Sequence, residues 1–139
     1  MKTLVIAEAG VNHNGNIDLA KKLIAEAAVA GANLVKFQTF LAKNIVSTTA
    51  PKADYQKKTT DSDESQLDMI RKLELSRADH EVLIKECSRC GIGFLSTAFD
   101  ADSFDLLTEL GCLDLIKIPS GELTNLPLLR YMTRLAKPV

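Results

Sequence analysis

The sequence lacks an excess of charge of either sign. Its 139 residues include 17 Lys and Arg against 18 Asp and Glu, which leaves a formal net charge of −1 at pH 7. Nucleic-acid-binding proteins usually carry a strong basic excess on one face, so this balance predicts no nucleic-acid partner. Hydrophobic residues make up 46% and charged residues 25% of the chain, as in ordinary folded domains. One globular domain is therefore expected.

Long apolar runs and abundant cysteine are also missing. No stretch approaches the ~20 apolar residues of a membrane span, and the N-terminus does not resemble a signal peptide, so no membrane association is predicted. The cysteines, Cys87, Cys90 and Cys112, do not suit a secreted disulfide framework and favour a cytoplasmic location. Cys87-x-x-Cys90 lacks the second ligand pair of a zinc site, so these thiols are expected to be buried on a helix face.

The chain does contain an alternation of short apolar runs and helical patterns. Buried strands are predicted at residues 4–7, 34–38, 94–97 and 115–118, and helices at 17–30, 65–73, 77–90, around 103–110 and at 126–135. This order indicates an α/β fold with parallel strands and right-handed crossovers. No glycine-rich phosphate fingerprint follows the first strand, which disfavours an open nucleotide-binding sheet. A TIM (β/α)₈ barrel needs about 250 residues, so the first four βα units, a half barrel, are predicted.

Polar residues gather at the carboxyl ends of these predicted strands, where ligands bind in parallel α/β folds. Lys36 and Gln38 are two residues apart and so project from one face of a strand. Lys36 and Lys117 each interrupt an apolar strand, where a lysine is costly unless an anion is close. With the hydroxyls of Ser96 and Ser120, they predict a site for a phosphate or carboxylate.

Two glutamates lie at equivalent strand ends. Glu8 and Glu122 are candidate acid/base groups or ligands for sugar hydroxyls. The alternative is purely structural, with both glutamates in ion pairs to Lys36 and Lys117.

Two further candidates lie in loops. His13 either caps its Asn/Gly-rich turn or touches a ligand. Residues 40–65 are too long for an ordinary connection and form a candidate functional loop, in which Tyr55 and Gln56 either cover the site or anchor the loop.

Five motifs occur in order along the chain: Ile6-Ala7-Glu8-Ala9-Gly10-Val11-Asn12-His13-Asn14-Gly15, Val35-Lys36-Phe37-Gln38, Glu64-Ser65-Gln66-Leu67, Phe94-Leu95-Ser96-Thr97 and Lys117-Ile118-Pro119-Ser120-Gly121-Glu122-Leu123-Thr124-Asn125. With them the sequence resembles the bacterial N-acetylneuraminate (sialic acid) synthase family, which includes legionaminic acid synthases. The resemblance implies a transferase that condenses phosphoenolpyruvate with N-acetylmannosamine or a related N-acyl sugar and releases phosphate.

The resemblance also implies roles for single residues. Glu8, Lys36, Lys117 and Ser120 would hold phosphoenolpyruvate with Ser96 nearby, and Gln38 and Glu122 would lie toward the acceptor sugar. A divalent metal, Mn²⁺ or Mg²⁺, is implied, but its histidine ligands lie in the second half of the family's barrel, which has no equivalent in this sequence. Family members are commonly dimers, so a homo-oligomer is expected.

Length is the departure from the family. Residues 1–139 correspond to the N-terminal half of the synthase barrel, and the second half and the antifreeze-like domain are absent from the sequence. The chain is therefore expected to be incomplete for catalysis, unless two half barrels pair. Three other readings stay open: a class I Schiff-base aldolase that uses Lys36 or Lys117, a synthase for a phosphorylated sugar, and a non-catalytic phosphoenolpyruvate-binding module.

Overall fold

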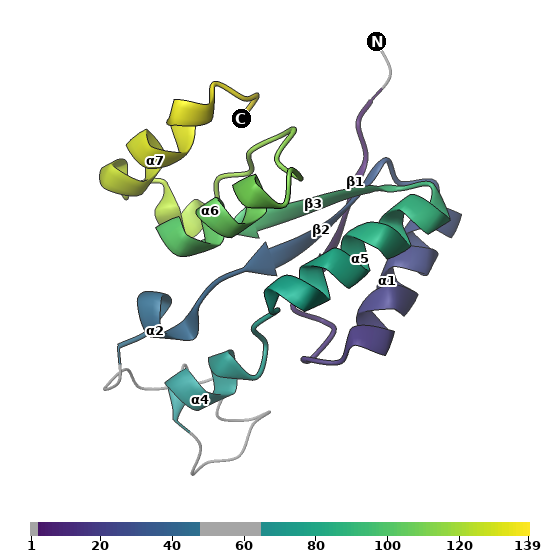
Figure 1. The fold of residues 1–139 in the computed structure, drawn as a ribbon, viewed down its shortest axis with the longest axis horizontal. Helices are drawn as coiled ribbons and strands as arrows, with labels where there is room; N and C mark the ends of the chain where they lie inside the picture. The colour runs from purple at the N-terminus through teal and green to yellow at the C-terminus, as the bar shows by residue number, and fades with distance from the viewer. Residues whose placement is uncertain (1–2, 48–64) are drawn as a thin grey trace.

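The computed structural model describes residues 3–47 and 65–139. At its centre is a parallel sheet in the order β1-β2-β3, formed by Ile6–Gly10, Leu34–Thr39 and Gly93–Ala98. Helices α1 (Ile17–Val29) and α5 (Arg77–Cys90) lie side by side against one face of this sheet (Figure 1). The predicted alternation of parallel strands and crossover helices is thus confirmed for the first three strands.

The ends of the two long helices follow from local sequence. The Asn16 side chain accepts a hydrogen bond from the backbone N–H of Leu19 and so caps α1. Ser76 and Asp79 form the predicted capping box at the start of α5. Gly91 ends α5 with a φ of 69°, a left-handed conformation that glycine adopts without steric cost.

The main core lies between the sheet and α1 and α5. Ile24 of α1, Val35 and Phe37 of β2, and Leu83 and Cys87 of α5 are buried there. Cys87 therefore packs as a small apolar side chain, and its burial raises the pKa of its thiol to about 12. The expected helix-face burial holds for Cys87, whereas Cys90 on the same helix is only half-buried.

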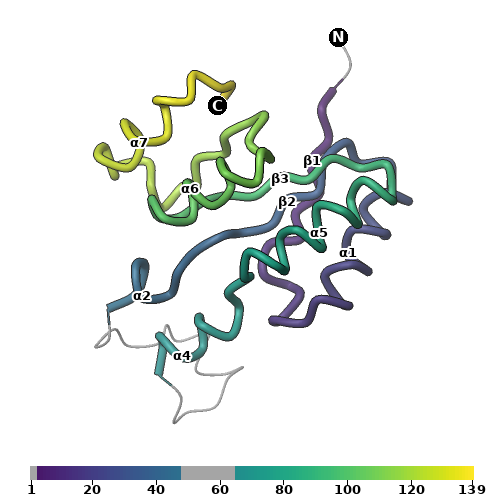
Figure 2. The backbone as a smooth tube through the Cα atoms, viewed as in Figure 1, coloured from purple at the N-terminus to yellow at the C-terminus, as the bar shows by residue number. Residues whose placement is uncertain are grey.

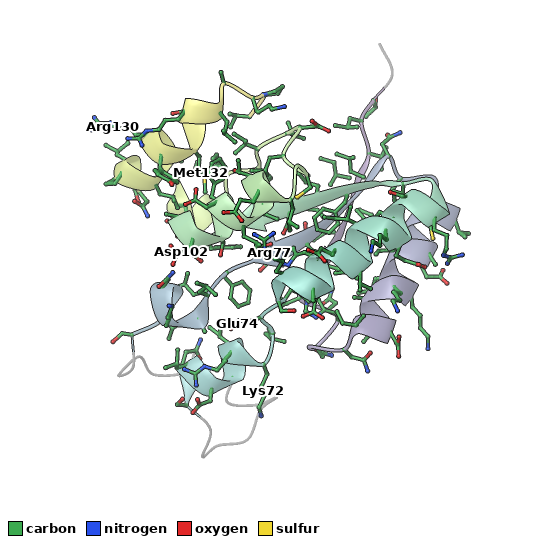
Figure 3. All side chains as sticks on the ribbon, viewed as in Figure 1. Lys72, Glu74, Arg77, Asp102, Arg130 and Met132 are labelled. Carbon is green, nitrogen blue, oxygen red and sulfur yellow. The ribbon has the colours of Figure 1, made fainter. Side chains whose placement is uncertain are left out.

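Two short helices lie between strand β2 and helix α5 in the chain. Helix α2 (Ala42–Ile45) is held by acidic side chains, because Glu74 accepts from the Ala42 N–H and Asp102 accepts from the Asn44 amide. Both acidic residues are labelled next to α2 in Figure 3. Helix α4 (Gln66–Arg71) is three residues shorter than the predicted range 65–73. Among the described residues, no helix is both long and apolar enough to cross a bilayer.

The first strand is displaced from its predicted position. It covers Ile6–Gly10 rather than residues 4–7, and Leu4 and Val5 are about half exposed. Its pairing with β2 shifts register between Glu8 and Gly10, which is a β-bulge. The bulge lets the strand continue past Glu8, the residue at which the apolar run ends.

The predicted fourth strand, residues 115–118, is not formed. After helix α6 (Ala101–Glu109), the chain reaches the short helices η1 (Ser120–Glu122), α7 (Leu126–Met132) and η2 (Thr133–Leu135) without another strand. A strand needs a ladder partner, but the Ile116 N–H donates to the Pro138 carbonyl at 2.8 Å instead of pairing with β3. Ile116 and Leu113 are buried with side chains of α6 and α7 in a second apolar cluster. Figure 2 shows α6 and α7 on the other side of the sheet from α5 and α1.

Candidate active site

A cavity of about 250 Å³ lies at the carboxyl end of the sheet, on the face opposite α1 and α5. Four of its side chains come from the strands, and strand pairing explains why they meet. Glu8 of β1 is paired with Lys36 of β2, and Gln38 of β2 with Thr97 of β3. Paired residues of parallel strands project to the same side of the sheet, and Lys36 and Gln38 share a face because they are two residues apart.

Lys36 is the buried charge of this cavity. It is only 8% exposed, and its Nζ lies 2.5 Å from Glu8 Oε2 and donates to Thr97 Oγ1 at 3.2 Å. The Glu8 side chain is 51% exposed, so its carboxylate reaches the solvent side of the cavity while it neutralises the lysine. This ion pair is the structural alternative predicted for Glu8 and Lys36, and both residues also line the cavity.

Gly10 makes room for these side chains. Its φ is +55°, and a Cβ at this position would lie 3.1 Å from Glu8 Oε1 and 3.5 Å from Gln38 Nε2. A side chain would therefore be both strained and crowded here. The glycine and the β-bulge together allow the Glu8 carboxylate to lie beside the Gln38 amide.

The other wall of the cavity comes from the segment that was predicted to be a fourth strand. Lys117, Pro119, Ser120 and Gly121 line it, together with Phe99 after β3. Lys117 is exposed and makes no hydrogen bond or ion pair to any residue that the structure describes. Although residues 115–118 form no strand, Lys117 and Ser120 line the same cavity as Lys36, at the carboxyl end of the sheet where the sequence predicted them.

Glu122 is a predicted residue that does not line the cavity. Glu122 is half-buried and accepts from the Asn125 amide at 2.7 Å, outside the lining of the cavity. It forms no ion pair with Lys117 in the part of the chain described, so the second structural ion pair is not observed. Tyr55 and Gln56 lie outside the described residues, and the role of Tyr55 stays a prediction.

Ser96 was assigned to the site, and the structure places it on the wrong face. It is buried and hydrogen-bonds with Thr39 Oγ1 at 2.7 Å, and Thr39 in turn hydrogen-bonds with His80 Nε2 at 2.8 Å. Ser96 is paired with Phe37 and therefore projects toward α5, whereas Thr97 projects into the cavity. The sequence gives no signal for this choice, because β3 is buried on both faces and shows no apolar–polar alternation.

His13 also lies away from the cavity. It is fully buried, and its Nδ1 accepts from the Gly15 N–H at 3.0 Å, which is the turn-capping role. Burial lowers its pKa, and the nearby Asp79 carboxylate opposes that shift.

The donor side chains of the described residues do not form a metal site. Nowhere in residues 3–47 or 65–139 do three His, Cys, Asp or Glu side chains converge as metal ligands. Within the cavity, the Glu8 carboxylate is already paired with Lys36, and both histidines of the chain are buried on the other face of the sheet. The residues described do not fit a divalent cation, so no chemical step is assigned to one here.

Comparisons with known proteins agree on one family. The NeuB family matches residues 23–139. The chain is 60% identical to N,N'-diacetyllegionaminic acid synthase of Campylobacter jejuni over 99% of its own length and 41% of the relative's. It is 48% identical to the synthase of the same name from Legionella pneumophila, over 94% of this chain and 36% of that one. The chain thus spans about two fifths of the length of these curated relatives.

Solved structures give the same result. The structure resembles sialic acid synthetase from Leptospira borgpetersenii with a TM-score of 0.79 and 27% identity, over 96% of this chain and 42% of that one. The spore coat polysaccharide biosynthesis protein SpsE of Bacillus subtilis matches with a TM-score of 0.71 and 34% identity, over 99% of this chain and 36% of that one.

Proposed function

This chain belongs to the NeuB family, and from that premise we propose that it supplies the phosphoenolpyruvate site of a sialic-acid-type synthase. The reaction joins phosphoenolpyruvate to N-acetylmannosamine or a related N-acyl sugar, gives a nine-carbon acid and releases phosphate. The observation that carries the proposal is the cavity in which Lys36 and Lys117 meet the hydroxyls of Thr97 and Ser120. Two cations and several donors suit a small trianion, whose charge-assisted hydrogen bonds would fix its orientation.

The residues divide into two groups in this proposal. Lys36, Thr97, Lys117 and Ser120 bind the carboxylate and phosphate of phosphoenolpyruvate and stabilise the charge that develops there. Gln38 lies toward the acceptor sugar. Bond formation joins C3 of phosphoenolpyruvate to the aldehyde carbon of the sugar, whose oxygen takes up a proton and becomes a hydroxyl. Water then adds at C2 and loses a proton, and the C–O bond to phosphate breaks, which leaves a ketone at C2 and releases phosphate. In this proposal Glu8 accepts the proton of that water, since binding of phosphoenolpyruvate draws Lys36 away from the Glu8 carboxylate with which it is paired.

The proposal extends to the architecture. Residues 1–139 supply the first four βα units of a TIM (β/α)₈ barrel, with β1, β2 and β3 as its first three strands. The parallel sheet with helices on one face and a polar cavity at its carboxyl end supports this assignment. A divalent metal, Mn²⁺ or Mg²⁺, belongs to the proposed reaction through the family, with ligands other than the described residues. A homo-oligomer also stays a proposal.

Calorimetric titration with phosphoenolpyruvate tests the site in the intact natural protein that carries this sequence. Lys117→Met keeps the length of the side chain and removes its charge, so we expect phosphoenolpyruvate to bind at least tenfold more weakly. Lys85→Met, on the exposed face of α5, is the matched control and leaves the affinity unchanged. Equal affinities of the two variants would contradict the site.

Phosphate release tests the reaction. With Mn²⁺ present, release is expected only when phosphoenolpyruvate and N-acetylmannosamine are both added. Borohydride reduction in the presence of pyruvate tests the aldolase hypothesis. A class I aldolase would form an imine between pyruvate and Lys36 or Lys117, and borohydride would reduce this imine to a stable covalent adduct. Such an adduct, without phosphate release, would overturn the proposal. Binding of phosphoenolpyruvate without phosphate release under any acceptor would instead indicate a binding module.

A further inference from the structure

The two lysines of the charged cavity differ in how they are held. Lys36 is buried, its ammonium is paired with the Glu8 carboxylate at 2.5 Å, and it donates to Thr97 Oγ1. Lys117 is exposed, and its ammonium has no hydrogen-bond or ion-pair partner in the part of the chain that the structure describes. One lysine is thus fixed as a cation by its neighbours, whereas the nitrogen of the other is accessible to a bound molecule.

The surroundings of Lys117 favour a phosphate. The charged side chains that line the cavity are two lysines and one glutamate, so the cavity carries an excess of one positive charge. Ser120, which is exposed, and Thr97 add two hydroxyls to the lining. A phosphate held by these groups brings the atoms that it carries next to the accessible nitrogen of Lys117.

We infer that Lys117 is a modification site, at which an acyl phosphate bound in this cavity transfers its acyl group to the side-chain nitrogen. The inference rests on the proposed function, because it uses the phosphate-binding groups of that site, and it adds a covalent event that the condensation does not contain. An acyl phosphate, like phosphoenolpyruvate, carries its phosphate through one oxygen on a trigonal carbon. In the acyl phosphate this carbon is a carbonyl carbon, which a lysine amine can attack.

The transfer balances with the acyl phosphate as its only co-reactant. The Lys117 ammonium loses one proton to water, and the resulting amine forms a C–N bond to the carbonyl carbon. The C–O bond to phosphate then breaks, the phosphate leaves with the electron pair, and it takes up the second proton that the nitrogen loses. The products are an amide and hydrogen phosphate, and nothing is oxidised or reduced. Binding in one cavity makes this step intramolecular, which accelerates it over reaction from solution.

The ion pair directs the transfer to one of the two lysines. While Lys36 is an ammonium paired with Glu8, its nitrogen has no free electron pair for attack. Acylation of Lys117 removes its positive charge. The cavity then keeps one lysine against one glutamate, so its attraction for phosphoenolpyruvate falls. An abundant acyl phosphate would therefore inhibit the proposed condensation by a covalent modification of its anion site.

Acetyl phosphate is the probe, and the intact natural protein that carries this sequence is the sample. Mass spectrometry of its peptides measures the acetylation rate at each lysine. We expect Lys117 to react at least tenfold faster than Lys85, which is also exposed and has no ion pair among the described residues but does not line the cavity. Saturating phosphoenolpyruvate should slow acetylation of Lys117 at least tenfold and leave the rate at Lys85 unchanged.

A second comparison separates transfer within the cavity from simple exposure. Ser120→Ala removes a hydroxyl that holds phosphate, so it should slow acetylation of Lys117 by acetyl phosphate several-fold. Acetic anhydride carries no phosphate, and its rate at Lys117 should be the same in the variant and the wild type. Calorimetry of the protein acetylated at Lys117 should show at least tenfold weaker binding of phosphoenolpyruvate than the untreated protein.

The outcomes distinguish the two proposals, and protection by phosphoenolpyruvate is measured on the wild type, so the test does not depend on the folding of a variant. If phosphoenolpyruvate binds the wild type but Lys117 reacts no faster than Lys85, the inference alone is overturned. The same holds if bound phosphoenolpyruvate does not protect Lys117. If calorimetry detects no binding of phosphoenolpyruvate to the wild type, the proposed function fails and the inference fails with it.

Discussion

Ser96 and Thr97 are neighbours with similar side chains, yet they project to opposite faces of the sheet and have different hydrogen-bond partners. Thr97 Oγ1 accepts from the Lys36 ammonium inside the candidate site. Ser96 joins Thr39 and His80 on the other face. The direction of the hydrogen bonds from Ser96 through Thr39 to His80 is fixed, because the Ser76 carbonyl can only accept. His80 Nδ1 therefore carries the proton of the imidazole. His80 Nε2 then accepts from Thr39, and Thr39 accepts from Ser96.

At this scale, paired substitutions separate the two hydroxyls. Thr97→Val keeps the shape of the side chain and removes the hydroxyl, so phosphoenolpyruvate is expected to bind about tenfold more weakly, and loss of the buried hydrogen bond to Lys36 costs about 1 kcal/mol of unfolding free energy. Ser96→Ala also loses a buried hydrogen bond and should cost about 1 kcal/mol of unfolding free energy, but it should leave the affinity unchanged. Calorimetry and urea denaturation of both variants check this. Weaker binding by Ser96→Ala, with unchanged binding by Thr97→Val, would contradict this assignment and would indicate that Ser96 contacts phosphoenolpyruvate.

Helix α5 packs in the main core, on the face of the sheet opposite the candidate site. Its His80 hydrogen-bonds with Thr39 of β2, and Thr39 hydrogen-bonds with Ser96 of β3. His80 is fully buried, and this burial lowers its pKa from the ordinary value of 6.5, against the opposing effects of the Ser76 carbonyl and the Asp79 carboxylate. His13, packed nearby on the same side of the sheet, also has a lowered pKa and faces the same carboxylate.

The lowered pKa of His80 predicts an acid-sensitive fold. Below pH 6.5 the unfolded chain binds a proton that the folded chain does not, so the free energy of unfolding falls as the pH drops from 6.5 toward the folded-state pKa. Urea midpoints between pH 7.5 and 5.5 measure this slope. In His80→Gln the slope should be smaller, with the part due to His13 remaining. An unchanged slope would mean that His80 does not titrate on unfolding.

For the molecule as a whole, the sheet has an edge without a partner. Strand β1 pairs only with β2 within the described residues, and apolar side chains at its first residue and just before it are open to solvent, with Ile6 37% and Leu4 55% exposed. Parallel strands are normally buried on both faces, and a free apolar edge is a template for pairing with another chain. This edge is where the proposed barrel would close.

Self-association of residues 1–139 follows from that edge. Sedimentation velocity should show dimers or larger species at micromolar concentration, because a second chain covers β1. Ile6→Lys places a charge on the exposed edge and should shift the distribution toward monomer, whereas Val29→Lys, an exposed position on α1, should not. A stable monomer of the unaltered chain would contradict the expectation.

What the sequence determined by itself is whatever depends on neighbours along the chain. The capping box of α5 and its Gly91 end are local, and the common face of Lys36 and Gln38 follows from the two-residue period of any strand. The motifs also sufficed to identify the family, and four residues that they contain, Glu8, Lys36, Lys117 and Ser120, line one cavity in the structure.

Only the tertiary structure decided what depends on partners distant in sequence. Thr97 replaces Ser96 because pairing with β2 sets which face of β3 is turned to the cavity, and a strand buried on both faces carries no record of that choice. Residues 115–118 have the composition of a strand, but a strand exists only through its ladder, and Ile116 pairs with Pro138 instead. The cavity that contains Lys36 and Lys117 likewise arises from segments that are joined only in space.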